Sequence, residues 1–458
     1  MEKTWIVFGF TVAYIVITTL VGMWSAKYTK DTTSFMTAKN QMPYFLVGIL
    51  LMSELIGPSS TVGTAQAAYD KGLAVAWNSS LLAVGYLLYA YFIAPKMNAL
   101  GEYTISGALA RHYGEGVRIV VSITMAFALT MVNVAAFTGG GALIGKLLEV
   151  SIPTAIYVIG IAASLNVAFG GIRGVGFANI IHTSFKYMGI LIVAGTAWYA
   201  MHGKPELMQD IPEAHFSLIA GVGYPTLIAW LIGNIGAIFS TQYILQSISG
   251  LPSPAEARKA AIVAAIVIFP IGLISAYIGI MAKAIFPDIK SIMALPAFFD
   301  LMNPWLVGIV ASAMIAATFV TILACQLGAT ALFMKDFYLP VMKPGKRHEF
   351  WATRGMAVVI GLLPIPFALL VPGIIKTLFF ARALRTAITV LVIFMLYLPH
   401  AANRKAGYLG LVVSVAVTVV WFLLGDPWGI DNIYIALIIP AAMMLIDYAI
   451  RKNRQTAK

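Results

Sequence analysis

Charged residues are scarce in this sequence. Only 10% of its 458 residues are Asp, Glu, Lys or Arg, whereas 60% are hydrophobic and the mean hydropathy is +0.89. Soluble domains carry about 25% charged residues. A soluble core of this size has no room for so much apolar surface, but a lipid bilayer accommodates it. The composition therefore predicts an integral membrane protein built from transmembrane helices.

Cysteine is also nearly absent. The single residue, Cys325, lies inside an apolar run. One cysteine excludes an internal disulfide framework and a metal site held by a cysteine cluster. The chain also lacks the H-E-x-x-H, P-loop and nucleophile-elbow motifs of several enzyme classes. We therefore expect neither an enzyme nor a bound cofactor.

Long hydrophobic runs, by contrast, recur thirteen times along the chain. Each is long enough to cross the hydrocarbon core of a bilayer. The first run is followed by no small-residue cleavage site, so we expect it to be retained as a span. The predicted spans are 5–25, 43–69, 73–94, 119–145, 153–172, 177–200, 216–246, 261–284, 305–334, 354–372, 374–398, 407–424 and 432–450.

Lysine and arginine are concentrated in alternate connections between these runs. Most of the 30 basic residues lie in the connections 26–42, 95–118, 248–260, 335–354 and 399–406, at Arg173 and in the tail from Arg451. The positive-inside rule then places the N-terminus outside and the C-terminus in the cytoplasm, as an odd number of spans requires. The net charge of +12 therefore needs no nucleic-acid partner. We expect one transmembrane domain over 1–458 in the inner (plasma) membrane, functioning as a monomer.

The second run contains the residues that would interrupt a helix. Gly57 and Pro58 break the helical pattern and are followed by Ser59, Ser60 and Thr61. A helix broken at mid-membrane is tolerated only where protein or a water-filled cavity surrounds it, and such breaks build binding sites in transporters. Glu54 strengthens this interpretation, because a carboxylate at the centre of a span costs about 2.5–3.5 kcal/mol to insert. A packing kink is the alternative.

Basic residues also occur inside predicted spans. Lys186 shares one helical face with Asn179 and with either His182 or Thr183. Arg382 and Arg385 lie three residues apart. An arginine pair that faced lipid would be very costly, so we expect both to point into the protein. Guanidinium groups bind carboxylates and phosphates bidentately, whereas structural pairing with backbone carbonyls or Glu54 is the alternative. Lys376 lies nearer the end of its span and is expected to snorkel towards the surface.

Four stretches of the chain resemble the sodium:solute symporter family. They are SSTVGTAQAAYDKGLA, GGIRGVGFANIIH, GNIGAIFSTQYILQSISG and AATFVTILACQLGATALFMKDFY, which resemble parts of the first, fifth, sixth and eighth core helices of that family. The resemblance covers nearly the whole chain in the correct order. It implies a LeuT-type fold with an extra helix at 5–25, inverted repeats at 43–200 and 216–398, and extra helices at 407–450.

The resemblance also implies site residues, between the broken first and sixth core helices. The implied sodium ligands, the first three through backbone carbonyls, are Ser53, Ile56, Ala317 and Thr321. The candidate substrate-binding residues, from the resemblance and from the residue types, are Ser59, Ser60, Ser79, Asn234, Arg382 and Arg385. Serine, asparagine and arginine together indicate a small anion, such as a monocarboxylate.

The chain departs from the family pattern around the sodium site. Val320 and Thr321, or in a second alignment Thr321 and Ile322, stand where the family has a Ser-Thr pair, so one hydroxyl is missing in either case. Asn179 stands where the family has Asp. Lys186, two turns from Asn179, is expected near the sodium position. Our hypothesis is that the Lys186 ammonium replaces sodium, with Glu54 as its partner, and that this pair carries a proton. The alternative is a conventional symporter whose sodium site retains the backbone carbonyls and Thr321.

The expected function is therefore secondary active transport of a small organic solute, coupled to sodium or a proton. The expected partners are that solute and the lipid bilayer. A channel or a membrane sensor is the alternative class, although the short segment after Arg451 leaves no room for a signalling domain.

Overall fold

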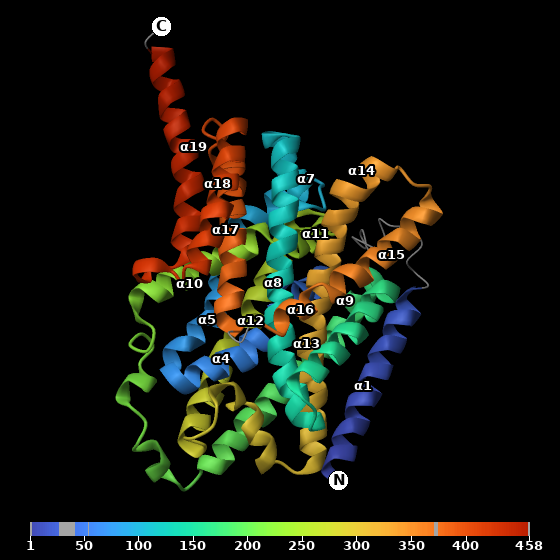
Figure 1. Ribbon diagram of the computed structural model, residues 1–458, viewed down its shortest axis with the longest axis vertical. Helices are drawn as coiled ribbons and strands as arrows, with labels where there is room; N and C mark the ends of the chain where they lie inside the picture. Colours follow the sequence, from blue (N-terminus) through green and yellow to red (C-terminus); the bar gives the residue numbers. More distant parts are fainter. Residues whose placement is uncertain (1, 27–41, 54, 371–373, 457–458) are drawn as a thin grey trace.

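The computed structural model describes residues 2–26, 42–53, 55–370 and 374–456, and within these ranges its regular elements are all helices (Figure 1). Nine of the helices described are long and apolar enough to cross a membrane. The two termini lie at opposite ends of the long axis in Figure 1. The prediction of a helical membrane protein is confirmed, whereas the count of thirteen spans and their inverted repeat stay predictions.

Most predicted runs correspond to one helix or to two consecutive helices. Single helices are α1 (Glu2–Ala26), α8 (Glu115–Leu148), α12 (Pro254–Ile285), α13 (Pro304–Phe333), α17 (Ile374–Tyr397), α18 (Arg404–Leu423) and α19 (Asn432–Thr456). Divided runs are α3 (Tyr44–Ser53) with α4 (Pro58–Lys71), α5 (Trp77–Leu88) with α6 (Ala94–Ala99), α10 (Gly223–Ser240) with α11 (Gln242–Ser249), and α15 (Lys346–Leu362) with α16 (Pro364–Ala368). A short 3-10 turn, η1 (Leu73–Ala76), leads into α5, and α7 (Ile105–Tyr113) lies between α6 and α8.

The break predicted in the second run is present between α3 and α4. Proline occupies the first turn of α4, where its missing N–H group costs no helical hydrogen bond. The Ser60 hydroxyl donates to the carbonyl of Leu55, and the Thr61 hydroxyl donates to the carbonyl of Gly57 at 3.2 Å. The Ser60 hydroxyl therefore satisfies a backbone oxygen beside the interruption.

A second break separates α10 from α11. Thr241 has an extended backbone, with φ −62° and ψ 126°, between the two helices. The Ser240 hydroxyl donates to the carbonyl of Arg385 in α17 at 2.8 Å. The position agrees with the broken sixth core helix that the family resemblance implies.

Two predicted runs belong to one helical element. The runs 153–172 and 177–200 form α9 (Ile152–Met201). Its first residues pack against Gly141 and Gly145 at the end of α8, and its last residues lie beside Met281 at the end of α12. An ion pair between Lys146 and Asp300 joins the end of α8 to the connection after α12, so both ends of α9 lie on the same side of the bundle. The two halves of α9 therefore run in opposite directions, as two separate spans would.

The two halves of α9 have different neighbours. In the first half, Ile156 packs against Gly141 of α8. In the second half, the Tyr187 hydroxyl donates to the carbonyl of Val267 in α12. The halves therefore retain the separate packing partners expected of two core helices.

Close backbone contacts join α12 to the first helices of the chain. A Cβ atom at Gly279 would overlap the carbonyl oxygen of Ala65 in α4. A Cβ atom at Gly272 would overlap the carbonyl oxygen of Ala76 in η1. Glycine allows this approach because it has no side chain between the two backbones. Helices α4, η1 and α12 are therefore in direct backbone contact.

Helix α13 has similar contacts with α8 and α9. A Cβ atom at Gly140 of α8 would lie 3.0 Å from the Thr318 hydroxyl, and one at Gly189 of α9 would overlap the Ala313 side chain. These contacts form a second closely packed group of helices.

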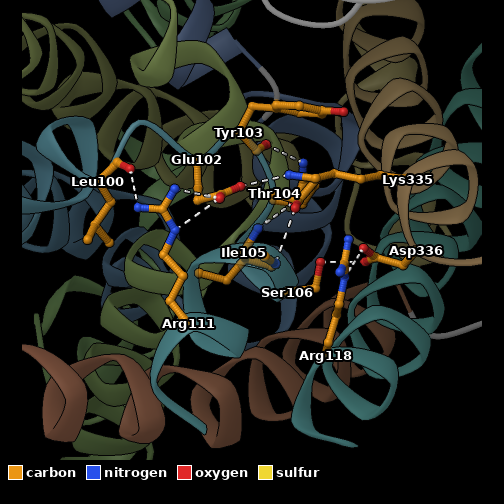
Figure 2. A network of polar contacts seen from close by, with 12 residues as sticks. Leu100, Glu102, Tyr103, Thr104, Ile105, Ser106, Arg111, Arg118, Lys335 and Asp336 are labelled. Atoms are coloured by element: carbon orange, nitrogen blue, oxygen red, sulfur yellow. Dashed lines mark hydrogen bonds and ion pairs between the residues drawn. The ribbon is translucent and has the colours of Figure 1, made fainter. Parts of the chain in front are cut away.

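A polar network closes one end of the bundle around the α6–α7 connection (Figure 2). Glu102 accepts hydrogen bonds from Arg111, at 2.8 Å, and from Lys335, at 2.7 Å. The Arg118 Nε group lies 2.7 Å from Asp336, which also accepts from Ser106. Because Lys335 and Asp336 follow α13, and Arg118 belongs to α8, the network joins the α6–α7 connection to both helices.

The network extends to α11 through Gln242. The Gln242 Oε1 atom accepts from the backbone N–H of Ile105 at 2.9 Å, and its Nε2 group donates to the carbonyl of Tyr103 at 2.9 Å. Gln242 is the first residue of α11, immediately after the break at Thr241. The polar network is therefore linked directly to the second broken helix.

Candidate functional site

Three of the predicted substrate-binding residues meet in one buried polar cluster. Arg382 Nη1 donates to Oδ1 of Asn78 at 3.1 Å. Asn234 Nδ2 donates to the backbone carbonyl of Asn78 at 3.1 Å. The Asn78 side chain donates to the Thr64 hydroxyl at 3.0 Å, and that hydroxyl lies 3.5 Å from the hydroxyl of Ser79. The five residues come from α4, α5, α10 and α17.

Sequence reasoning missed two members of this cluster. Asn78 and Thr64 are both fully buried, and Asn78 makes the contacts that connect the others. The available signal was a buried amide beside Ser79 in an apolar run, because a buried polar group requires partners. Asn78 orients the Arg382 guanidinium, since its side-chain oxygen accepts from Arg382 while its amide group donates to Thr64.

Arg385 lies elsewhere, although it shares α17 with Arg382. Arg385 Nη1 donates to the Thr241 hydroxyl at 2.9 Å, at the break between α10 and α11. Its backbone carbonyl accepts from Ser240. Arg385 thus contacts the interrupted helix on both sides of the break. The Arg385 guanidinium therefore has a different hydrogen-bond partner, Thr241, from the Asn78 that binds Arg382, and its role in substrate binding stays a prediction.

The two serines of the α4 first turn are buried beside the α3–α4 break. Ser60 donates to the carbonyl of Leu55 within its own segment, and Ser59 is 3% exposed. Their position beside the α3–α4 break is as predicted, whereas a role in substrate binding stays a prediction.

Several implied cation ligands lie close together. The Thr321 hydroxyl donates to the carbonyl of Ala317 at 3.3 Å. A Cβ atom at Gly57 would overlap that hydroxyl, so Thr321 lies directly against the α3–α4 break. Ile56 precedes Gly57 and is fully buried. The break and the α13 residues implied by the resemblance are therefore adjacent.

The remaining predicted coupling residues are only partly described. Glu54 and the side chains of Ser53 and Asn179 lie outside the described part of the chain. Lys186 is 2% exposed, one helical turn after the buried His182 in α9. His182 Nδ1 is hydrogen-bonded to the Tyr14 hydroxyl of α1. Lys186 is thus inside the protein as predicted, and its pairing with Glu54 stays a prediction.

A cavity of about 300 Å³ lies beside the cluster, near the ends of α4, α10 and α17 and the α18–α19 connection. Trp230 of α10 and Phe379 of α17 line it and stack on each other, with ring centroids 5.3 Å apart and an interplanar angle of 20°. The Arg382 guanidinium carbon is 4.4 Å from the centroid of the Phe379 ring. The aromatic pair therefore lies between the cavity and the guanidinium group.

Comparisons with known proteins agree with this architecture. The chain resembles the sodium/glucose cotransporter of Vibrio parahaemolyticus, with 25% identity over 393 residues, covering 76% of this chain and 72% of the relative. It also resembles the uncharacterized symporter YwcA of Bacillus subtilis (strain 168), with 24% identity over 378 residues, covering 78% of this chain and 74% of the relative.

Solved transporter structures share the fold. A substrate-bound, outward-open Na⁺-coupled sialic acid symporter matches with a TM-score of 0.85 and 16% identity, covering 97% of this chain and 98% of that chain. Mhp1, a nucleobase-cation-symport-1 family transporter in a closed conformation, matches with a TM-score of 0.60 and 16% identity, covering 89% and 93% of the two chains. These relatives and structural neighbours are transporters, not enzymes. Because the model of the sodium:solute symporter family matches residues 35–413, the chain belongs to that family of secondary transporters.

Proposed function

We propose that the protein transports a small carboxylate and that Arg382 binds the carboxylate group. The observation that supports this proposal is a guanidinium group that is only 1% exposed, inside a polar cluster between α5, α10 and α17. A guanidinium in a span is costly unless charged or polar groups surround it. Arginine forms bidentate hydrogen bonds with carboxylates, so such a ligand would compensate part of this cost.

The other cluster residues would select the rest of the solute. Asn78, Asn234 and Thr64 supply amide and hydroxyl groups with both donor and acceptor capacity. They are suited to a solute with a hydroxyl or carbonyl near its carboxylate. A neutral polyol is the competing substrate class, and in that case Arg382 would only support Asn78.

Uptake by purified protein in proteoliposomes tests the substrate class. We expect saturable uptake of at least one of acetate, pyruvate and lactate, and little uptake of glucose or proline. Arg382→Gln should raise the KM for the carboxylate at least tenfold, since losing a charge-assisted hydrogen bond costs about 1.5–3 kcal/mol. Arg258→Gln, on an exposed part of α12, is the matched control and should behave as wild type. Preferred uptake of glucose, unaffected by Arg382→Gln, would overturn the proposal.

We infer that the coupling cation position lies between the α3–α4 break and α13. Two groups are candidates for this position. One is the Lys186 ammonium, with a proton as the coupling ion, and the other is sodium bound by backbone carbonyls and Thr321. The burial of Lys186 supports the first, and the contact of Thr321 with Gly57 supports the second. We favour proton coupling, since Val320 cannot supply the hydroxyl that the family pattern has there.

A sodium gradient at constant pH, compared with a pH gradient without sodium, distinguishes the two occupants. We expect uptake to follow the pH gradient and to lose that dependence in Lys186→Gln. Strong stimulation by sodium in the wild type, abolished by Thr321→Ala, would instead establish the conventional symporter.

The proposed orientation places the polar network of Figure 2 in the cytoplasm and the cavity beside Trp230 outside. Protease access to the tail in sealed vesicles tests that orientation.

A further inference from the structure

The cavity beside Trp230 has a floor made of two aromatic rings. Trp230 and Phe379 stack with their centroids 5.3 Å apart, and both side chains are buried. Directly behind Phe379, the Arg382 guanidinium lies 4.4 Å from the ring centroid. One aromatic ring therefore separates the interior of this cavity from the guanidinium of the buried cluster.

The arrangement leaves little space for the ring pair to move inward. A Cβ atom at Gly233, one turn after Trp230, would lie 2.7 Å from Ile433, 3.5 Å from Phe379 and 3.6 Å from Arg382. The absence of a side chain at Gly233 thus permits the close packing of α10 and α17 behind the floor. Opening a route from the cavity to Arg382 requires Trp230 and Phe379 to separate.

A second basic residue of α17 lines the same cavity. Lys376, Phe379 and Arg382 are spaced three residues apart, so they follow one row along the helix. The row rises by about 9 Å between the two cationic residues. The Lys376 side chain is exposed, and its ammonium group is 5.5 Å from the Phe422 ring centroid. Lysine, aromatic ring and arginine therefore follow one another from the cavity towards the cluster.

The acidic residues of the cavity are occupied by local hydrogen bonds. Asp426 accepts from the side-chain amide of Asn432 at 2.9 Å, and Asp431 accepts from the backbone N–H of Ile433 at 2.9 Å. Both contacts hold the α18–α19 connection at the start of α19. Lys71, at the end of α4, adds a second ammonium group to the lining. The lining therefore carries two carboxylates, held by neutral donors at the α18–α19 connection, and two exposed ammonium groups.

We propose that this cavity is a second, outer binding site for the transported carboxylate, with Lys376 as the residue that holds its carboxylate group. The proposal rests on the proposed function of Arg382. The apolar part of the solute contacts Trp230 and Phe379, and the solute reaches Arg382 when these rings separate. A volume of about 300 Å³ is at the lower end of the range typical of small-molecule sites.

Chemical replacement of the charge at position 376 tests the site. The one native thiol, Cys325, is buried in α13, so Lys376→Cys introduces an accessible thiol. Aminoethyl methanethiosulfonate converts that thiol into a mixed disulfide carrying an ammonium group, and methanesulfinate leaves. The sulfonatoethyl reagent attaches a negative charge by the same chemistry. The substrate probe is whichever of acetate, pyruvate and lactate the wild type transports with the lowest KM.

The expected KM for this carboxylate rises about three- to fivefold in Lys376→Cys, because an exposed charge pair contributes at most about 1 kcal/mol. The aminoethyl reagent should restore the wild-type KM, and the sulfonatoethyl reagent should raise the KM further, both with little change in the maximal rate. Lys204→Cys, on an exposed connection away from the cavity, is the control and should respond to neither reagent.

Two failures are distinguishable. If the wild type transports none of the three carboxylates, the proposed function is overturned and the outer site with it. If a carboxylate is transported but its KM is the same for both attached charges at position 376, only the outer site is overturned.

Discussion

The carboxylate of Glu102 gives the sharpest test of the polar network in Figure 2. It accepts from Lys335 at 2.7 Å, with both side chains about one-fifth exposed, and from Arg111, which is about half exposed. Burial alone would raise the pKa of the Glu102 carboxyl, but Lys335 and Arg111 hold that pKa below its usual value. The ionised form is therefore favoured by folding.

Glu102→Gln removes this charge while keeping the shape of the side chain. The exposed pair with Arg111 is worth about 0.2–1 kcal/mol, and a half-buried, charge-assisted contact such as that with Lys335 is worth somewhat more. We expect a total loss of about 1–2 kcal/mol, which lowers the Tm of the purified protein in detergent by about 1–2 °C at pH 7. Glu115→Gln is the matched control, because Glu115 is 75% exposed and its contact with Arg118 is 3.2 Å. We expect it to lower the Tm by less than about 0.5 °C.

The same comparison has a defined pH dependence. A depressed carboxyl pKa contributes stability that is present above the unfolded pKa of about 4.3 and is lost as the pH falls through the folded pKa. The Tm difference between wild type and Glu102→Gln should therefore be constant from pH 8 to pH 6 and should shrink below pH 4. Equal Tm losses for Glu102→Gln and Glu115→Gln at pH 7, or a difference that grows at low pH, would refute the reasoning.

Two further substitutions probe the buried sites. In Gly57→Ala, the added Cβ overlaps the Thr321 hydroxyl, and overpacking of this kind costs about 1–3 kcal/mol, so we expect the initial uptake rate to fall at least fivefold. In the control Gly355→Ala, the added Cβ meets nothing within 4 Å, and uptake should be unchanged. Similar uptake rates for the two variants would contradict the contact between Gly57 and Thr321. In Asn78→Asp, a carboxylate about 3 Å from the Arg382 guanidinium competes with a carboxylate solute, so the KM should rise at least tenfold; an unchanged KM would separate Asn78 from the solute site.

The sequence predicted those features that would have a high free-energy cost if they were exposed to lipid. The break at Gly57–Pro58 and the interior positions of Lys186 and Arg382 follow from the expense of exposing backbone or charge to lipid. The role of Asn78 was not predictable in this way, because it depends on contacts between α5, α10 and α17. Pairings between distant segments leave no local pattern.

The surroundings of the basic residues in α17 also depend on contacts between distant segments. The sequence left substrate binding and structural pairing open for both Arg382 and Arg385, and the structure gives them different hydrogen-bond partners, Asn78 and Thr241. Lys376 was expected only to snorkel, and the cavity at its position became visible only in three dimensions.

The glycine contacts along α12 determine where the molecule can move. The backbones touch at Gly272 and Gly279 without side chains between them, so we expect α4, η1 and α12 to move together. The helices around α13 form another such group. The boundary between these groups passes through the contact of Gly57 with Thr321. A cation or an ammonium group bound at that boundary would contact both groups of helices. Its binding and release would therefore be coupled directly to the conformational change of transport.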